Sequence, residues 1–236
     1  MKKVKLDNNL EKQFKCDTTL NLFGMAQSPT ASVFVEGDNM AVVDGDQCGF
    51  YGSNTQFVDS IIEMMPESFE VCATATSLVE YIAEKHGHVD WKTDCGLFVY
   101  NGKPIEHQPT YHTQEMSADY WQMVSEGTPY KASRDEIVPN LQNKPSSAIY
   151  VDGRPVCWAM LHTTGSLGML YTLPEFRRRG MALDVSVDLC RKVIAQGNKP
   201  FAYIVKGNTA SEQLSQKYNM EYVGDYSWVG ITKENK

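Results

Sequence analysis

The segment 167–196 holds the residue types that could bind an anion. A β-rich run, Leu167–Leu173, leads through the basic loop Pro174–Arg179 to Gly180 and a helical pattern that continues to about residue 196. The backbone N–H groups that open a helix have no partners within it, and together with the helix dipole they favour an anion such as a pyrophosphate. Gly180 would let a phosphate approach the backbone closely, and the small side chain of Ala182 would keep the first turn open.

The three consecutive arginines of this loop admit two interpretations. Arg177, Arg178 and Arg179 could add charge-assisted contacts to the anion, or they could form a solvated surface beside an ordinary glycine turn. Two later features favour the anion site. A second β-rich run, Phe201–Val205, follows the helix, and Asn208 begins another helix just beyond it.

Composition and charge limit the kinds of partner that we expect the protein to bind. The chain of 236 residues carries a net charge of -7, so the excess of Lys and Arg that neutralises nucleic-acid phosphates is missing, and we expect no nucleic-acid partner. No apolar run approaches the ~18 residues of a membrane helix, so we expect no membrane insertion. The basic start has no apolar stretch behind it, as a secretory signal would. We expect an intracellular protein, cytoplasmic or, as the alternative, mitochondrial.

The six cysteines are scattered along the chain. They form no Cys-x-x-Cys pair and no Cys/His metal spacing, and we expect reduced thiols and no bound metal. These cysteines are Cys16, Cys48, Cys72, Cys95, Cys157 and Cys190.

Hydrophobic periodicity predicts mixed α and β structure throughout the chain. In the first half the pattern predicts strands at 31–35, 40–43, 71–74 and 96–100 and helices at 54–65 and 76–85. In the second half it predicts helices after Ser117 and Ser133, at 180–196 and from Asn208, and strands at 147–151, 155–161, 167–173, 201–205, 221–223 and 226–231. The turn-rich segment 101–112 separates the halves, which predicts domains at 1–110 and 111–236.

These motifs resemble the GCN5-related N-acetyltransferase (GNAT) superfamily. The hexapeptide Arg177–Ala182, with Met181 in its fifth place, matches the signature Arg/Gln-x-x-Gly-x-Gly/Ala. Asn208, Ser211 and Leu214 match a later motif, Asn-x-x-Ala/Ser-x-x-Leu. The hexapeptide alone is weak evidence, but the strand, the helix and the Asn-capped helix follow in the same register.

Within that superfamily the second half is similar to the glycine N-acyltransferases. The shared features are the strand Pro155–Trp158, the turn Thr164–Gly165, the loop Thr172–Arg177 and the aromatic helix around Tyr120–Trp121. The resemblance covers roughly residues 117–232. It implies an α/β fold with a mixed sheet, in which a GNAT domain follows a smaller or degenerate GNAT-like half.

The resemblance implies that acetyl-CoA or another acyl-CoA lies between the strands 167–173 and 201–205. The backbone of Tyr171, Thr172 and Leu173 would align the pantetheine arm, and the N–H groups from Arg178 to Ala182 would hold the pyrophosphate. The expected cofactor-binding residues are Tyr171, Thr172, Leu173, Arg177, Arg178, Arg179, Gly180, Met181, Ala182, Asn208, Ser211 and Ser215.

The sequence departs from the family at both acid–base positions. Ser166 stands where glycine N-acyltransferases have a Glu regarded as the base, and Ser215 stands where many GNAT enzymes have an acidic Tyr. The candidate catalytic residues are Ser166, by its position, and His162, as a substitute base, although a lone His is more often structural. Tyr218 matches a core position of the family, which predicts a packing role.

The resemblance therefore implies an acyl-CoA-dependent N-acyltransferase. Its acceptor would be a glycine-like amino acid or another small amine, attacked directly in a ternary complex. A polyamine or a peptide amine is an alternative acceptor, and a non-catalytic acyl-CoA-binding protein is the alternative class. The oligomeric state is not predicted.

Overall fold

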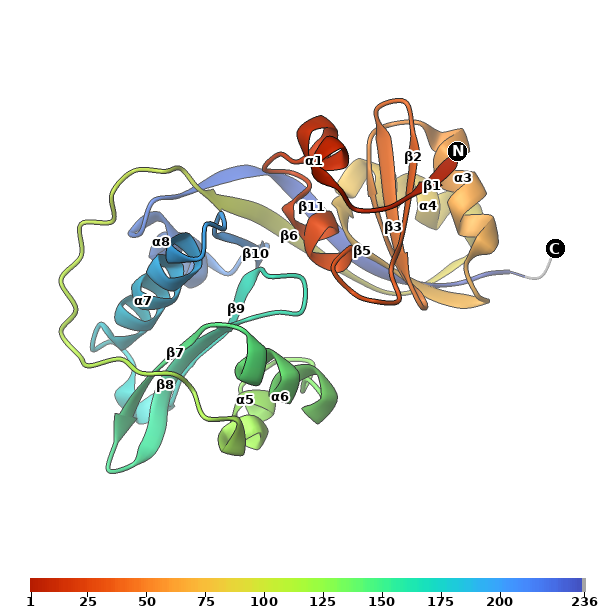
Figure 1. The fold of residues 1–236 in the computed structure, drawn as a ribbon. Coiled ribbons are helices and arrows are strands. Elements are labelled where there is room, and N and C mark those ends of the chain that lie inside the picture. The colour runs from red at the N-terminus through yellow and green to blue at the C-terminus, as the bar shows by residue number, and fades with distance from the viewer. Residues whose placement is uncertain (235–236) are drawn as a thin grey trace. The chain divides into compact units, whose positions relative to one another are not determined.

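The computed structural model describes residues 1–234, which form two units (Figure 1). The first unit contains Met1–Leu97, Ile204–Gly207 and the chain from Tyr222 onward, and the second contains Phe98–Tyr203 and Asn208–Glu221. Two long strands, β6 (His88–Tyr100) and β11 (Met220–Thr232), contribute residues to both units. The domain limits 1–110 and 111–236 stay a prediction.

The first unit is built on a mostly antiparallel sheet with the strand order β1-β2-β3-β4-β5-β11-β6. β4 and β5 are the exception, because they pair in parallel at Gln47–Glu70 and Cys48–Val71. Before β6 its elements are β1 (Lys2–Val4), α1 (Asn8–Phe14), α2 (Leu20–Met25), β2 (Ser32–Glu36), β3 (Asn39–Asp44), β4 (Gln47–Tyr51), α3 (Thr55–Met64), β5 (Ser68–Ala75) and α4 (Thr76–His86).

The second unit contains a separate antiparallel sheet in the order β7-β8-β9. β10 belongs to the larger sheet, where it is the neighbour of β6. Among the described residues no ladder joins β9 to β10. Its elements are η1 (Ala118–Tyr120), α5 (Trp121–Glu126), α6 (Arg134–Asn143), β7 (Ser146–Val151), β8 (Arg154–Leu161), β9 (Leu167–Thr172), η2 (Pro174–Phe176), α7 (Met181–Ala195), β10 (Phe201–Val205) and α8 (Thr209–Gln216), followed by β11.

Helices cover both faces of this three-stranded sheet, with α5 and α6 on one side and α7 on the other (Figure 1). The face toward α6 is set by strand alternation, which turns Trp158 and Met160 of β8 the same way. Both side chains are fully buried against Val124, Ile137 and their neighbours. The burial of this apolar layer holds the β8–β9 hairpin against α6.

The two halves repeat one order of elements. In the first half the order is strand, two helices, three strands, helix, strand, helix, strand, from β1 to β6. The second half follows the same order, with an isolated bridge between Gln114 and Ala148 in the place of the first strand. The chain is therefore a duplicated α/β structure.

The structure confirms the predicted elements, most of them with boundary shifts of a few residues. The largest shift is at the strand predicted over 96–100, since β6 already begins at His88. One prediction was wrong: the segments 221–223 and 226–231 form the single strand β11, which continues through Gly224. The sequence pattern also missed β1, α1, α2 and β4. β4 was missed because Gly49 interrupts its short apolar run, and a glycine lowers strand propensity.

A partly buried carboxylate links α3 to α4 in the first unit. Asp59 accepts hydrogen bonds from the Tyr81 hydroxyl at 2.8 Å, Lys85 Nζ at 2.6 Å and His86 Nε2 at 2.7 Å. Burial alone would raise the pKa of Asp59, but the hydrogen bonds from Lys85, Tyr81 and His86 outweigh it and lower the pKa. The cluster therefore stabilises the fold only while Asp59 is ionised.

We expect Asp59→Asn to lower the free energy of unfolding at neutral pH. The folded-state pKa lies below the unfolded value, so this contribution is present above about pH 4 and is lost as the pH falls through the folded pKa. Urea unfolding of both proteins at a series of pH values measures it. The gap between variant and wild type should narrow in acid, and a gap independent of pH would contradict the account.

Candidate active site

The N-terminus of α7 is open. Gly180 precedes the helix with a left-handed φ of 86°, and no side chain caps the first turn. Within residues 1–234, the backbone N–H groups from Arg178 to Ala182 donate to no acceptor, whereas those of Leu183 and Asp184 bond to the Gly180 carbonyl. A Cβ built at Gly180 would meet nothing within 4 Å. The helix thus presents a row of free donors to open space.

The corresponding helix of the first half is closed at the same point. At the start of α3 the Asn54 side chain accepts from the N–H groups of Gln56 and Phe57. The Asn39 side chain accepts from those of Ser53 and Asn54, which fills the loop before the helix. An anion at this end of α3 would have to displace two amide side chains, so the first half has no equivalent site.

The arginines before α7 surround the free donors with positive charge. All three are exposed. Arg177 donates to the Thr172 carbonyl at 3.0 Å and lies 5.5 Å from the centre of the Tyr171 ring. Arg179 donates to the Glu175 carbonyl at 2.8 Å. Two of the three guanidinium groups are thus held on the loop, where they lower the cost of bringing an anion to the helix.

Strand β9 is distorted beside this loop. Its pairing with β8 shifts register between Trp158 and Met160, and Met169 takes a left-handed φ of 46°, which marks a β-bulge. After the bulge, the Leu173 N–H donates to the Val156 carbonyl at 2.9 Å. Since inward and outward groups alternate in an antiparallel pair, the backbone of Thr172 points away from β8, toward the edge without a partner strand.

The later motif caps α8. The Asn208 side chain accepts from the Ser211 N–H at 3.2 Å, which is the contact that an Asn-x-x-Ser spacing favours at a helix start. Ser215 is 1% exposed and donates to the Glu212 carbonyl at 2.8 Å, so its hydroxyl is committed within the helix. Tyr218 is buried and its pKa is raised by burial, which confirms the predicted packing role.

The two candidate catalytic residues flank the β8–β9 turn. The His162 N–H donates to the Ser166 carbonyl at 2.9 Å, which makes the two residues a cross-strand pair. Ser166 is buried, whereas the His162 side chain is 30% exposed and remains reachable from solvent. Of the two side chains, only His162 has a group that accepts a proton at neutral pH.

Asp184 lies in the first turn of α7 and was missed by the motif search. Its carboxylate is 2% exposed and accepts from His107 Nε2 at 2.6 Å and from the N–H groups of Thr110 and Tyr111 at 2.9 and 2.8 Å. The Asp184 carboxylate thus holds the segment that precedes α5 against α7, the helix of the candidate site. The available signal was an acidic residue beside Met181 and Val185 in an apolar stripe.

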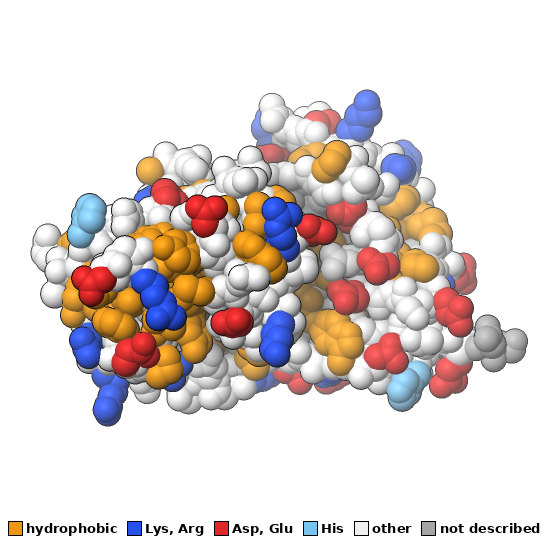
Figure 2. All heavy atoms as spheres, turned by 90° about the horizontal axis from the view of Figure 1, so that it is seen from below, with side chains coloured by type: hydrophobic (Ala, Val, Ile, Leu, Met, Phe, Trp, Pro, Cys, Tyr) orange, Lys and Arg blue, Asp and Glu red, His pale blue; other side chains and the backbone are white. Residues whose placement is uncertain are grey.

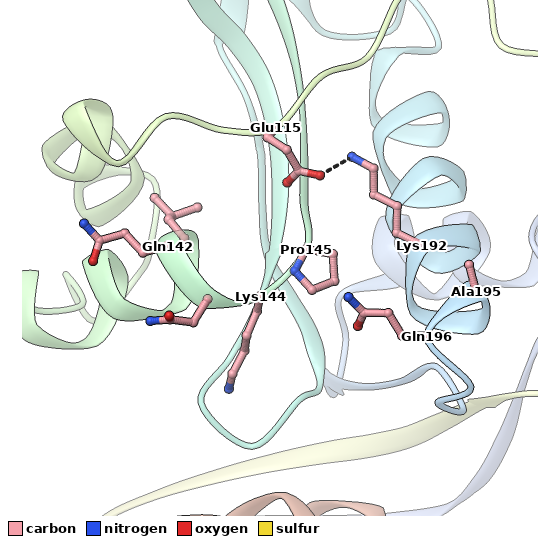
Figure 3. A pocket seen from close by; sticks show the side chains of 9 residues that line it. Glu115, Gln142, Lys144, Pro145, Lys192, Ala195 and Gln196 are labelled. Carbon is pink, nitrogen blue, oxygen red and sulfur yellow. Dashed lines mark ion pairs between the residues drawn. The ribbon is translucent and has the colours of Figure 1, made fainter.

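A separate hollow lies at the other end of α7 (Figure 3). It has a volume of about 430 Å³ and lies at Lys192 and Gln196, about 20 Å from Gly180 by helix rise. Lys192 already pairs with Glu115 at 2.8 Å and with Asp188 at 3.0 Å, so its charge is committed. The hollow is therefore distinct from the candidate cofactor site. The open N-terminus of α7 itself lies at the surface.

Figure 2 shows acidic and basic side chains interspersed on the face drawn. Residues 1–234 contain no group of three or more His, Cys, Asp or Glu side chains placed to hold a metal ion. Over the same residues, no helix combines the length and apolar character that crossing a bilayer requires. The six cysteines are free thiols, and Cys16 alone is exposed.

Comparisons with known proteins agree with this architecture. Residues 151–229 match the family model described as FR47-like protein. Among solved structures, a Drosophila protein superposes with a TM-score of 0.79 at 16% identity and covers 97% of this chain and 98% of its own. A GNAT-family acetyltransferase from Novosphingobium aromaticivorans gives 0.62 at 12% identity, covering 92% and 97%. A tandem GNAT protein of clavulanic acid biosynthesis gives 0.54 at 9% identity, covering 92% and 88%.

The chain therefore has the fold of GNAT proteins, and residues 151–229 are similar to the FR47-like family. Its sequence is similar to that of glycine N-acyltransferases. The orangutan (Pongo abelii) protein is 27% identical over 127 residues, which are 52% of this chain and 42% of that protein. The human protein is 31% identical over 72 residues, which are 30% of this chain and 24% of that protein. The matches thus span less than half the length of these relatives.

We expect Asp184→Asn to destabilise the second unit by about 1–3 kcal/mol, because an amide cannot accept all the hydrogen bonds that the buried carboxylate accepts. Urea unfolding at neutral pH measures the loss. Asp152→Asn is the matched control, since Asp152 lies in an exposed turn with a φ of 50° that Asn adopts readily. Equal stabilities of the two variants would show that the Asp184 contacts contribute nothing.

Proposed function

We propose that this protein transfers an acyl group from acyl-CoA to the amine of a small molecule, with a glycine-like amino acid as the favoured acceptor. The superfamily supports the reaction, and the sequence similarity to glycine N-acyltransferases supports the acceptor class. The free donors at the start of α7 are the observation that carries the proposal.

In the proposed complex the diphosphate lies against the N–H groups from Arg178 to Ala182. The backbone donors supply direction and the helix dipole supplies charge complementarity. The exposed side chains of Arg177, Arg178 and Arg179 add charge-assisted contacts. Gly180 suits this role because a side chain there would project into the space that the phosphate needs.

The pantetheine arm would run along the free edge of β9, past Tyr171, Thr172 and Leu173. Among these residues the Thr172 backbone faces outward, whereas the Leu173 N–H is used by β8. The Thr172 carbonyl already accepts from Arg177, so the Thr172 N–H is the better contact for the arm. The missing ladder between β9 and β10 leaves this edge unpaired. Asn208, Ser211 and Ser215 would act from α8 by shaping the other side of the arm.

The amine would attack the thioester carbonyl directly in a ternary complex. Holding donor and acceptor together supplies much of the acceleration, because it replaces a bimolecular encounter by a positioned one. An amine that is protonated in solution has no free electron pair, so a base must remove a proton before attack.

A non-catalytic acyl-CoA-binding protein is the second candidate. Its specific support is the loss of both family acid–base positions: Ser166 is buried, and the Ser215 hydroxyl is committed to the Glu212 carbonyl. Neither hydroxyl titrates near neutral pH. Both candidates would bind acyl-CoA, but only the enzyme would transfer its acyl group to an amine.

Binding is tested first, with Gly180→Asp and Gly180→Asn as a matched pair. Both side chains tolerate the left-handed conformation and both cap helices well, so both variants should fold. Only Asp places a negative charge where the diphosphate lies, and we expect calorimetry with CoA to show at least ~10-fold weaker binding for Asp than for Asn, which is about 1.4 kcal/mol. Equal affinities would place the diphosphate elsewhere.

Turnover separates the two candidates. We expect the wild-type protein to form an N-acyl product from benzoyl-CoA or acetyl-CoA only when an amine is present, with glycine preferred over a polyamine. Mass spectrometry of the amide product is the appropriate measurement, because thiol reagents would also react with the exposed Cys16. CoA binding without turnover on any amine would support the non-catalytic protein.

A further inference from the structure

The imidazole of His162 occupies a space that a glycine leaves open. A Cβ built at Gly168 would lie 2.0 Å from His162 Nε2 and 2.4 Å from Cδ2, so no larger residue fits beneath the ring as it stands. Gly168 has no left-handed φ, unlike ten other glycines of the chain, and its backbone conformation does not call for glycine. The glycine at 168 is explained by the ring that lies against it.

A carboxylate lies on the other side of the ring. Glu136 of α6 places Oε1 3.8 Å from His162 Nδ1, which is beyond hydrogen-bonding distance but close enough for a charge to act. Both side chains are about 30% exposed. A carboxylate at this position favours the tautomer with its proton on Nδ1 and leaves the electron pair on Nε2.

The turn that carries His162 is held from the same helix. Asn140 donates to the Thr163 hydroxyl at 3.1 Å, and Lys144, just after α6, donates to the carbonyls of His162 and Thr163. Lys144 and Glu136 are the charged groups beside the histidine, and burial lowers the pKa of Lys144. Among residues 1–234, no group lies within hydrogen-bonding distance of Nε2.

Nε2 thus lies against Gly168 of β9, the strand along which the pantetheine arm is proposed to run. Gly168 immediately precedes the bulge at Met169, and the Thr172 edge follows it. Ser166, at the position of the family's base, is the cross-strand partner of His162. We infer that His162 is the general base of this protein, with Glu136 as a positioning residue and Gly168 as the residue that makes room for the ring; this inference rests on the proposed function.

The proton balance is complete without another reactant. The acceptor ammonium gives one proton to Nε2, which passes it to solvent. The freed electron pair forms the C–N bond as the C–S bond of the thioester breaks. The proton that the new amide nitrogen loses ends on the CoA sulfur, so the products are the amide and the free thiol.

The test compares two acceptors that differ in basicity. Glycine is protonated at neutral pH and needs the base, whereas methoxyamine is largely unprotonated and does not. With benzoyl-CoA as donor, we expect His162→Gln to lower kcat/KM for glycine by about 10²–10⁴-fold and to change kcat/KM for methoxyamine far less. Calorimetry should give unchanged CoA affinity.

The two supporting residues have their own variants. Glu136→Gln should give a smaller loss of the same kind, selective for glycine, because it removes the charge that favours the reactive tautomer. Gly168→Ala should do likewise by displacing the ring. His112→Gln changes an exposed histidine, and Gly224→Ala adds a methyl group whose nearest neighbour is 3.7 Å away; both should behave as wild type.

Each outcome decides one point. If wild type turns over and His162→Gln loses both acceptors equally, or loses neither, His162 is not the base, while the proposed function stands. If wild type acylates neither acceptor although it binds CoA, the proposed function fails and the base assignment fails with it. Circular dichroism and thermal unfolding identify any variant that loses activity by unfolding.

Discussion

The constraint on which this structure depends is that a helix must leave its first backbone donors unpaired. At the start of α7 nothing in the described chain fills them, and the loop that leads there carries three arginines and a glycine in an open, left-handed position. An unfilled end has a cost in isolation, because capping normally stabilises a helix. A bound anion would remove that cost.

The duplication provides an internal comparison. Both halves follow one order of elements, yet the first half closes the two features that the second leaves open. Its β4 and β5 are paired, and the side chains of Asn39 and Asn54 fill the start of α3. In the second half β9 and β10 form no ladder and α7 has no side-chain cap. The first half thus keeps the same order of elements with this end closed.

The proposed chemistry follows the same logic of space and charge. Two serines stand where the family has ionisable groups, and one of them, Ser215, is held inside α8. The nearby imidazole of His162 has a glycine against one side and a carboxylate on the other. Residues 162 and 166 lie opposite each other in the hairpin. The role of the base can therefore move from one position to the other without a change in the strands. In the proposed mechanism the base would thus lie at position 162, across the hairpin from Ser166.

The sequence alone determined most of the alternation of strands and helices, the helix starts after Ser133 and at Asn208, and the Arg177–Ala182 motif, because these depend on local periodicity and on backbone donors a few residues away. Contacts distant in the chain were decided only by the tertiary structure. The bonds of Asp184 to residues 107–111, the closeness of Glu136 to His162 and the fit of that ring over Gly168 join segments that no local pattern connects. The reason is physical. A helix cap pairs with backbone donors a few residues away, so it is visible in the local sequence. The space around a side chain, in contrast, is defined only once the sheet and the helices have packed.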